Sequence, residues 1–344
     1  MAVGNRYGVH RVIEPTGALP QPAWKIDNTM EVYDNEMLID VHTLNIDSAS
    51  MTQIEEAAGG DKEHIKDRML QIVAERGKHH NPETGSGGML IGTIEELGDQ
   101  LKERNLQKGD KIATLSSLSL TPLRIDEILE VKTEIDQVRI KGKAILFESA
   151  LYSKLPKDME DTLALAALDV AGAAAQTAKL VKPGDNVVII GAGGKSGLLC
   201  LHEAKKRAGV SGKVIGVSRS EGGCQRIEQT GLADEIIQGS ATEPLNILSQ
   251  VEEATDGELA DVTINNVNVS DTEMGSILPT KDGGLVYFFS MATSFTKAAL
   301  GAEGVGKDVN MIVGNGYTKD HAQITLEILR ENKEIREIFE QKYI

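Results

Sequence analysis

The residues with the clearest chemical meaning form a glycine-rich turn, "GAGGKSG", that directly follows the apolar run "NVVII". Its first glycine permits a tight turn, the next two let backbone approach a pyrophosphate, and the last allows a helix to pack closely on the strand. The N–H groups at the start of that helix would point at the phosphates. The turn therefore predicts a dinucleotide site, to which we assign Gly191, Gly193, Gly194, Lys195, Ser196 and Gly197.

The end of the next apolar run, "KVIGVSRSE", indicates which dinucleotide binds. NAD enzymes commonly place an acidic residue there to hold the ribose hydroxyls, whereas NADP enzymes place a small residue and an arginine. Ser218 and Arg219 offer a hydroxyl and a guanidinium to a 2′-phosphate. Glu221, three positions further on, leaves NAD open. We expect NADP as the cofactor, with NAD as the alternative.

These motifs lie in a half of the chain where apolar strands alternate with helices, which is typical of parallel βαβ units. The pattern predicts an α/β fold with a doubly wound parallel sheet over residues 155–318, followed by a helical segment at 319–344. Ligands of such sheets bind at the carboxyl ends of the strands. We therefore add the residues that follow the later strands to the predicted cofactor site: Asn265, Asn266, Ser290, Met291, Ala292, Asn315 and Gly316.

Residues 1–154 differ, because their apolar runs are short and separated by Gly, Pro and polar turns. This pattern predicts a separate β-rich domain. Ile65, Met69, Ile72 and Val73 recur at helical spacing and predict a helical insertion near 61–76.

The composition narrows the class of protein. A net charge of −16 argues against nucleic-acid binding and is compatible with a small cationic substrate. The two cysteines form no CxxC pair, so a structural zinc site is not indicated. The first residues contain no apolar signal-peptide core, and the longest apolar stretch is interrupted by Asp169 and Lys179. We therefore expect a cytoplasmic protein that does not span a membrane.

On these motifs the chain resembles the medium-chain dehydrogenase/reductase superfamily. "GAGGKSG" is similar to its "GAAGGVG" turn, and "LQKGDKIATL" is similar to the "FKVGDRV" of its GroES-like catalytic domain. The resemblance implies a Rossmann domain after a GroES-like domain, and a homodimer. The superfamily's "GHE" zinc signature would fall at Gly88 and Met89, and its ligand cysteine near Asp47, but this chain has neither the histidine nor the cysteine. The resemblance therefore implies an enzyme without catalytic zinc.

Two further segments, "YGVHRVIEPTGALPQPAWKIDN" and "LNIDSASMTQI", resemble the family of L-erythro-3,5-diaminohexanoate dehydrogenases. This resemblance implies NAD(P)-dependent oxidative deamination at C3 in anaerobic lysine degradation, which yields 5-amino-3-oxohexanoate and ammonium. Such a diamino acid needs a cation for its carboxylate and acidic or carbonyl groups for its ammoniums.

Candidate residues for this chemistry lie in the N-terminal half. Asp47, near the position of a metal ligand in zinc-bearing relatives, is our candidate catalytic acid–base group; the alternative is a turn aspartate that bonds its own backbone. Arg11 and Lys25 are candidates for binding the carboxylate, and Glu148 is a candidate for binding an ammonium. We interpret the histidine pair at 79 and 80 as loop residues.

Two alternative functions stay open. The glycine turn is also compatible with a zinc-independent NADPH quinone or enone reductase. The missing zinc ligands are compatible with a non-catalytic NADP(H)-sensing protein.

Overall fold

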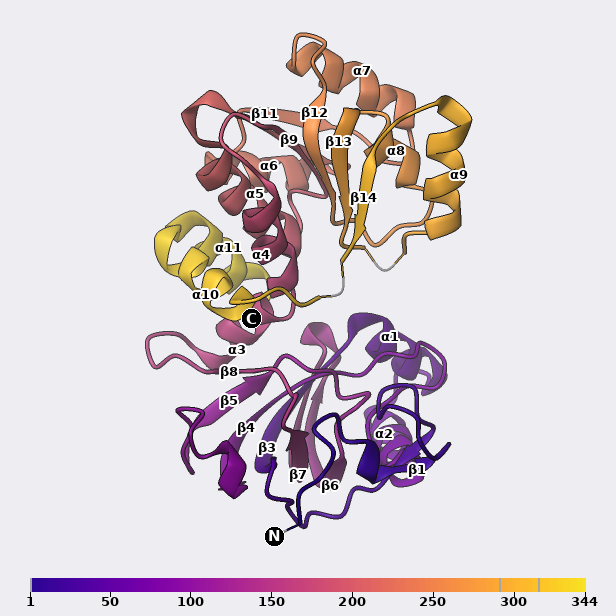
Figure 1. Cartoon of the computed structure of the whole chain (residues 1–344), viewed down its shortest axis with the longest axis vertical. Helices are drawn as coiled ribbons and strands as arrows, with labels where there is room; N and C mark the ends of the chain where they lie inside the picture. The colour runs from indigo at the N-terminus through magenta and orange to yellow at the C-terminus, as the bar shows by residue number, and fades with distance from the viewer. Residues whose placement is uncertain (1, 291, 315) are drawn as a thin grey trace. The chain divides into compact units, whose positions relative to one another are not determined.

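The computed structural model divides the chain into two compact units, Met1–Asp161 and Thr162–Ile344 (Figure 1). It describes residues 2–290, 292–314 and 316–344. Each unit contains one six-stranded sheet, and the first also has a small two-stranded one.

The first unit is built on an antiparallel sheet with the strand order β6-β7-β3-β4-β5-β8. Two short strands, β1 and β2, pair separately. The strands are β1 (Val12–Glu14), β2 (Lys25–Ile26), β3 (Glu36–Ile46), β4 (Gly88–Leu97), β5 (Lys111–Thr114), β6 (Leu123–Lys132), β7 (Gln137–Phe147) and β8 (Tyr152–Lys154). The helices are α1 (Ser48–Ala57) and α2 (Lys62–Arg76), with 3₁₀ turns at Val9–Arg11, Asp99–Leu101 and Thr133–Ile135.

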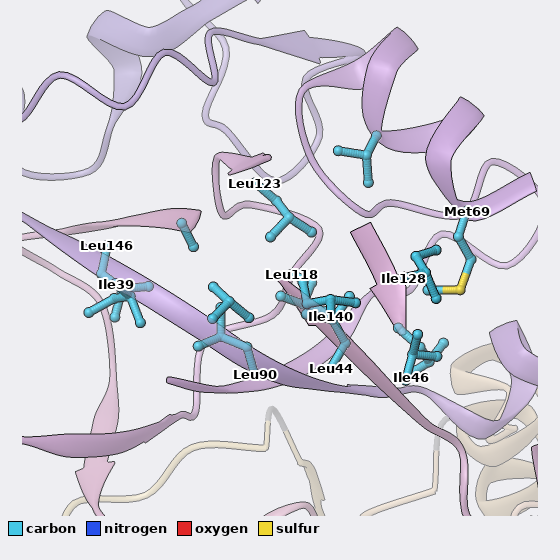
Figure 2. Close-up of a cluster of buried hydrophobic side chains, with 14 of the residues drawn as sticks. Ile39, Leu44, Ile46, Met69, Leu90, Leu118, Leu123, Ile128, Ile140 and Leu146 are labelled. Carbon is cyan, nitrogen blue, oxygen red and sulfur yellow. The ribbon is translucent and has the colours of Figure 1, made fainter. Parts of the chain in front are cut away.

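Helices α1 and α2 begin and end where their capping residues dictate. Asp47 and Asp61 cap the two N-termini, each by accepting hydrogen bonds from backbone N–H groups of the first turn. Gly77 ends α2 in the left-handed conformation, with φ of 72°. The apolar stripe of α2, which includes Met69, packs into the core of the sheet, as Figure 2 shows. The helix predicted near 61–76 is therefore held by this burial.

A buried ion pair ties the N-terminal segment to the sheet. Arg11 and Glu36 are each 1% exposed, and the guanidinium Nε and Nη2 donate to the two carboxylate oxygens at 2.7 Å. The remaining donors of Arg11 reach the carbonyl oxygens of Thr29 and Glu31, and Asp27 lies 3.6 Å away. Four of the five N–H donors of Arg11 are thus hydrogen-bonded, and the carboxylates of Glu36 and Asp27 balance its buried charge.

The segment after α2 is a loop, but its basic side chains are buried. The Lys78 ammonium donates to the carbonyl oxygens of Pro20 and Gln21, at 2.6 and 3.0 Å. Burial lowers the pKa of Lys78 to about 7. His79 is fully buried with neither ring nitrogen in a hydrogen bond of good geometry, and burial lowers its pKa to about 4. His79 is therefore neutral at physiological pH.

The second unit is a doubly wound parallel sheet with the strand order β11-β10-β9-β12-β13-β14. This is the strand order of a dinucleotide-binding sheet. Strands β10 and β11 are added on one side of β9 and strands β12 to β14 on the other, so the order switches between β9 and β12. The strands are β9 (Asn186–Ile190), β10 (Lys213–Ser218), β11 (Glu235–Gln238), β12 (Ala260–Asn265), β13 (Thr280–Phe288) and β14 (Asn310–Val313).

Helices cover both faces of this sheet (Figure 1). Helices α5 and α6 pack on β9, β10 and β11, with α4, α10 and α11 beside them, while α7, α8 and α9 cover the opposite face. They are α3 (Asp161–Leu168), α4 (Ala171–Leu180), α5 (Lys195–Ala208), α6 (Glu221–Thr230), α7 (Pro244–Ala254), α8 (Glu273–Ile277), α9 (Phe295–Val305), α10 (His321–Glu331) and α11 (Lys333–Lys342), with a 3₁₀ turn at Gly209–Ser211.

The predicted fold class, a Rossmann sheet together with a β-rich domain, is confirmed. The apolar stretch around residues 162–181 forms the helices α3 and α4, which meet at an angle of 53°. Within the described residues no single helix is long and apolar enough to cross a membrane, although this bent pair has the necessary combined length and composition.

The buried imidazole of His79 makes stability depend on pH. Because its pKa is about 4 in the folded chain against an ordinary 6.5, the unfolded chain binds the extra proton between these values. His79 therefore makes the folded state less stable as the pH falls from about 6.5 to 4. The slope reaches about 1.4 kcal/mol per pH unit at most. We expect His79→Gln to remove this slope.

The measurement is urea unfolding at a series of pH values between 7 and 4.5, followed by fluorescence of Trp24, the only tryptophan and a residue of the first unit. His64→Gln is the matched control, because the side chain of His64 is 71% exposed. A stability difference between wild type and His79→Gln that stayed constant over this pH range would contradict the expectation.

Candidate active site

The glycine turn joins β9 to α5 through close backbone contacts that exclude side chains. Gly191 has φ of 79°, a conformation that favours glycine. A β-carbon on Gly197 would lie 2.2 Å from the carbonyl oxygen of Gly191, and one on Gly193 would lie 2.4 Å from that of Gly223. The first turn of α5, which begins at Lys195, is thereby held directly against the strand end. The N–H groups of this first turn have no acceptor within the helix, and such groups form a favourable site for an anion.

A cavity of about 350 Å³ opens beside this turn. Part of the predicted cofactor set lines this cavity: Gly191, Gly193, Gly194, Ser218, Arg219 and Asn266. Its lining also includes polar residues that the sequence did not single out. The polar and glycine lining is Gly191, Gly193, Gly194, Ser218, Arg219, Ser220, Arg226, Gly239, Ser240, Thr242, Asn266, Asn268 and Thr272.

Hydroxyl and guanidinium groups therefore gather at the carboxyl ends of β10 and β11. Arg226, which the sequence analysis missed, donates its Nε–H to the carbonyl oxygen of Gly193 at 2.8 Å. Arg226 lies within α6, whereas Arg219 precedes that helix. The position of Arg226 at the cavity depends on how α6 packs against the glycine turn, which the sequence alone does not show. The residues fit a dinucleotide: the backbone is open where a pyrophosphate needs room, and two cations face the adjoining space.

The other predicted cofactor residues have more varied surroundings. Lys195 forms an ion pair with Asp169 at 2.8 Å, while Ser196 and Gly197 are buried in the first turn of α5. Asn265 is fully buried, and its amide donates to Thr272 and Ser276 at 2.9 Å. Those contacts fix the segment after β12.

Asn266 differs from its neighbour, because its amide nitrogen is buried with no hydrogen-bond partner among the described residues while the residue lines the cavity. Its Oδ1 is 3.7 Å from the thiol of Cys200. A buried, unsatisfied donor at a cavity wall is a group that a ligand acceptor can satisfy.

The residues that follow β13 and β14 lie at the same edge of the sheet as Asn266, because these strands run parallel to β12. Ser290 is buried and accepts a hydrogen bond from the backbone of Ala292 at 3.1 Å. Gly316 has φ of 76° and approaches Gly172 of α4 closely. Met291 and Asn315 lie outside the described residues.

In the first unit, Asp47 lies at the carboxyl end of β3, beside the start of β4. Strand pairing sets Gly88 opposite Ile46, the residue before Asp47. Gly88 has φ of 114°, and a β-carbon there would lie 2.1 Å from the carbonyl oxygen of Asn45. Met89, where the signature's histidine would fall, pairs with Asn45 and is buried.

The carboxylate of Asp47 caps α1. Its Oδ1 accepts from the N–H of Ala49 at 3.1 Å, the residue is exposed, and no described residue donates to its Oδ2. Three hydroxyls gather in the same region, since Ser50 of α1 is 2.5 Å from Thr84 and 2.6 Å from Ser86. Both readings of Asp47, a cap and an acid–base group, are compatible with this geometry.

The three predicted substrate-binding residues do not lie together with Asp47. Glu148 follows β7 next to the start of β3, whereas Asp47 follows the opposite end of β3, roughly 30 Å away along an extended strand. Glu148 accepts from Asn35 and is 3.8 Å from Arg104. Arg11 is fully engaged by the contacts described above, and Lys25 is half-buried in β2. Arg11 and Glu148 are thus engaged with other residues of the first unit.

No group of three or more His, Cys, Asp or Glu side chains is arranged to hold a metal ion in the part of the chain that the structure describes. The one pair of buried histidines, His79 and His80, has no carboxylate or thiol partner there.

Known proteins match both the whole chain and its fold. A family model described as the L-erythro-3,5-diaminohexanoate dehydrogenase N-terminal domain matches residues 10–156. L-erythro-3,5-diaminohexanoate dehydrogenase from Acetoanaerobium sticklandii is 63% identical over 342 residues, covering 99% of each chain. The enzyme of the same name from Fusobacterium nucleatum is 62% identical over 345 residues, covering 100% of each.

Solved structures show the same fold at low identity. A zinc-dependent alcohol dehydrogenase 2 from Streptococcus pneumonia is 19% identical with a TM-score of 0.56, and the match covers 93% of this chain and 89% of the other. The CurK enoyl reductase is 16% identical with a TM-score of 0.55, covering 92% and 81%. A mycobacterial protein complexed with NADPH is 15% identical with a TM-score of 0.52, covering 93% and 84%.

The structural relatives agree with a medium-chain dehydrogenase/reductase fold, and the two relatives above 60% identity span essentially the whole length of this chain. The chain belongs to the L-erythro-3,5-diaminohexanoate dehydrogenase family.

Proposed function

We propose that this protein oxidatively deaminates L-erythro-3,5-diaminohexanoate at C3, with NADP⁺ as the hydride acceptor, in anaerobic lysine degradation in the cytoplasm. The observation that carries the proposal is the full-length identity of 62–63% to two dehydrogenases of that name. The glycine turn, with its open backbone and helix N-terminus, supports the nicotinamide cofactor.

The proposed reaction balances without a metal ion. The C3 ammonium loses a proton, C3 loses hydride to NADP⁺, and water converts the resulting imine to 5-amino-3-oxohexanoate and ammonium. We assign the proton transfers to Asp47, whose Oδ2 is free of hydrogen bonds from described residues, and which follows the end of β3 opposite Gly88 and Met89. A carboxylate also stabilises the ammonium before it is deprotonated.

The polar groups beyond β10 support NADP. Ser218 ends the strand where an NAD enzyme commonly has a carboxylate, and Arg219 and Ser220 line the same cavity. Glu221 begins α6 and is exposed, and it is absent from the cavity lining. A 2′-phosphate would therefore meet hydroxyls and a guanidinium at this strand end.

The direct test is an absorbance assay at the reduced-nicotinamide band with 3,5-diaminohexanoate and either NADP⁺ or NAD⁺, combined with an ammonium assay. We expect reduced cofactor and ammonium in equal amounts. Oxidation of NADPH by small quinones or enones, without a response to the diamine, would select a reductase instead. Cofactor binding without turnover of any amine or carbonyl would select a nucleotide sensor.

Arg219→Asp tests the phosphate assignment. We expect the KM for NADP⁺ to rise by about tenfold or more, while the KM for NAD⁺ changes little, because the new carboxylate repels a 2′-phosphate. Arg336→Asp on α11 is the control, since Arg336 pairs with the exposed Glu340 and does not line the cavity. An unchanged ratio of the two KM values would reject Arg219 as a phosphate ligand.

Asp47→Asn separates the two roles of Asp47. Asparagine also caps helices well, so stability should change little, whereas loss of the acid–base group should lower kcat by about 10²-fold. Asp61→Asn is the matched control, because Asp61 caps α2 in the same way. Equal kcat values for the two variants would identify Asp47 as a cap alone.

A further inference from the structure

The last turn of α11 lies beside the glycine turn. Helix α11 packs on α5 and α6, in the part of the second unit where Figure 1 shows the yellow C-terminal helices. The ring of Tyr343 is 5.1 Å from that of buried Phe339 and 5.7 Å from the ammonium of Lys195, the first residue of α5. The end of the chain is therefore held against the start of the helix that begins at the proposed phosphate site.

Two cations in this region, Lys342 and Arg226, form no ion pair with a carboxylate among the residues that the structure describes, whereas Lys195 pairs with Asp169. Earlier on α11, Lys333 pairs with Glu337 at 3.0 Å and Arg336 pairs with Glu340 at 2.8 Å. Lys342 lacks such a partner, because Ile338 and Phe339, which precede it by one turn, are buried apolar residues. Among the described residues no carboxylate forms an ion pair with Lys342.

Arg226 provides a second cation without a carboxylate partner in the described part of the chain. Its Nε–H donates to the carbonyl oxygen of Gly193, and the residue lines the cofactor cavity. Partial burial, together with the charge of Arg226, lowers the pKa of Lys342. Arg226 lines the cavity, and Lys342, whose ammonium is 5.3 Å from the centre of the Tyr343 ring, lies at the end of the helix that packs on α6.

Like charges that are held together without a counter-ion form a favourable site for an anion. The chain as a whole has a net charge of −16, so an uncompensated positive cluster is a local exception. Lys195 belongs to the same region but is already paired with Asp169. The anion that fits is a phosphate group, because the cavity that Arg226 enters also contains the glycine turn and Ser218.

We propose that Arg226, Lys342 and Tyr343 form a C-terminal phosphate-binding arm, in which the two cations hold a phosphate of the bound dinucleotide and the Tyr343 ring supports them. This inference rests on the proposed function, because it requires that a dinucleotide binds at the glycine turn. It makes the end of the chain part of the cofactor site. Residues more than a hundred positions apart would then hold one phosphate.

Fluorescence titration with NADPH and with NADH tests the arm. We expect Lys342→Ala to raise the Kd for NADPH by about fivefold and to reduce the dependence of binding on KCl, since one charge-assisted contact is lost. Lys342→Arg should restore both properties. Lys333→Ala is the control on the same helix, because Lys333 is 80% exposed and pairs with Glu337.

Parallel titrations identify the phosphate. Weaker binding of NADPH alone assigns the arm to the 2′-phosphate, and equally weaker binding of both cofactors assigns it to the pyrophosphate. If wild type and Lys342→Ala bind the same cofactor equally well, the phosphate-binding role of the arm is rejected, while the proposed function stands. If wild type binds neither, the proposed function fails and the arm fails with it.

Discussion

The cofactor site depends on a steric constraint in the backbone between β9 and α5. A β-carbon at Gly197 would lie 2.2 Å from the carbonyl oxygen of Gly191, and one at Gly193 would overlap Gly223 of α6. Glycine at these positions lets α5 approach the strand so closely that its N–H groups face the cavity. The same contact seats α6 against the turn, which brings Arg226 to the carbonyl of Gly193. The N–H groups of α5 and the guanidinium of Arg226 can therefore approach the turn because Gly193 and Gly197 have no side chains.

In the first unit, strand register has the equivalent role. The pairing of β3 with β4 sets Gly88 opposite Ile46, next to Asp47 at the end of β3. The pairing of β3 with β7 places Glu148 at the opposite end. There, the buried contact between Arg11 and Glu36 closes the N-terminal segment onto the sheet. Breaking such a pair leaves an uncompensated buried charge, which is strongly destabilising.

Local signals predicted much of this structure from the sequence. The α/β alternation, the glycine turn and the residues after β10 are read within short windows, and their predicted places at one sheet edge follow from parallel topology. Contacts between residues far apart in the sequence could not be predicted in this way. Whether Arg11 faces a substrate or Glu36 depends on which strand end its segment reaches. The place of Arg226 depends on how α6 packs, and that of Lys342 on where α11 ends. The hydrophobic periodicity of a segment predicts its secondary structure, but it does not predict which distant residues the segment will contact.

The proposed reaction combines ligands of opposite charge, and the chain separates the groups that would bind them. The dinucleotide is a polyanion, and Arg219 and Arg226 line one cavity in the second unit, where α11, which ends at Lys342, packs on α6. The diamino acid carries two ammoniums, and the exposed carboxylate of Asp47 lies in the first unit. Within an acidic chain, local cations must be held free of neighbouring carboxylates to attract phosphate. The two earlier cations of α11 each pair with a glutamate one turn further on, whereas the positions one turn before Lys342 hold the apolar residues Ile338 and Phe339.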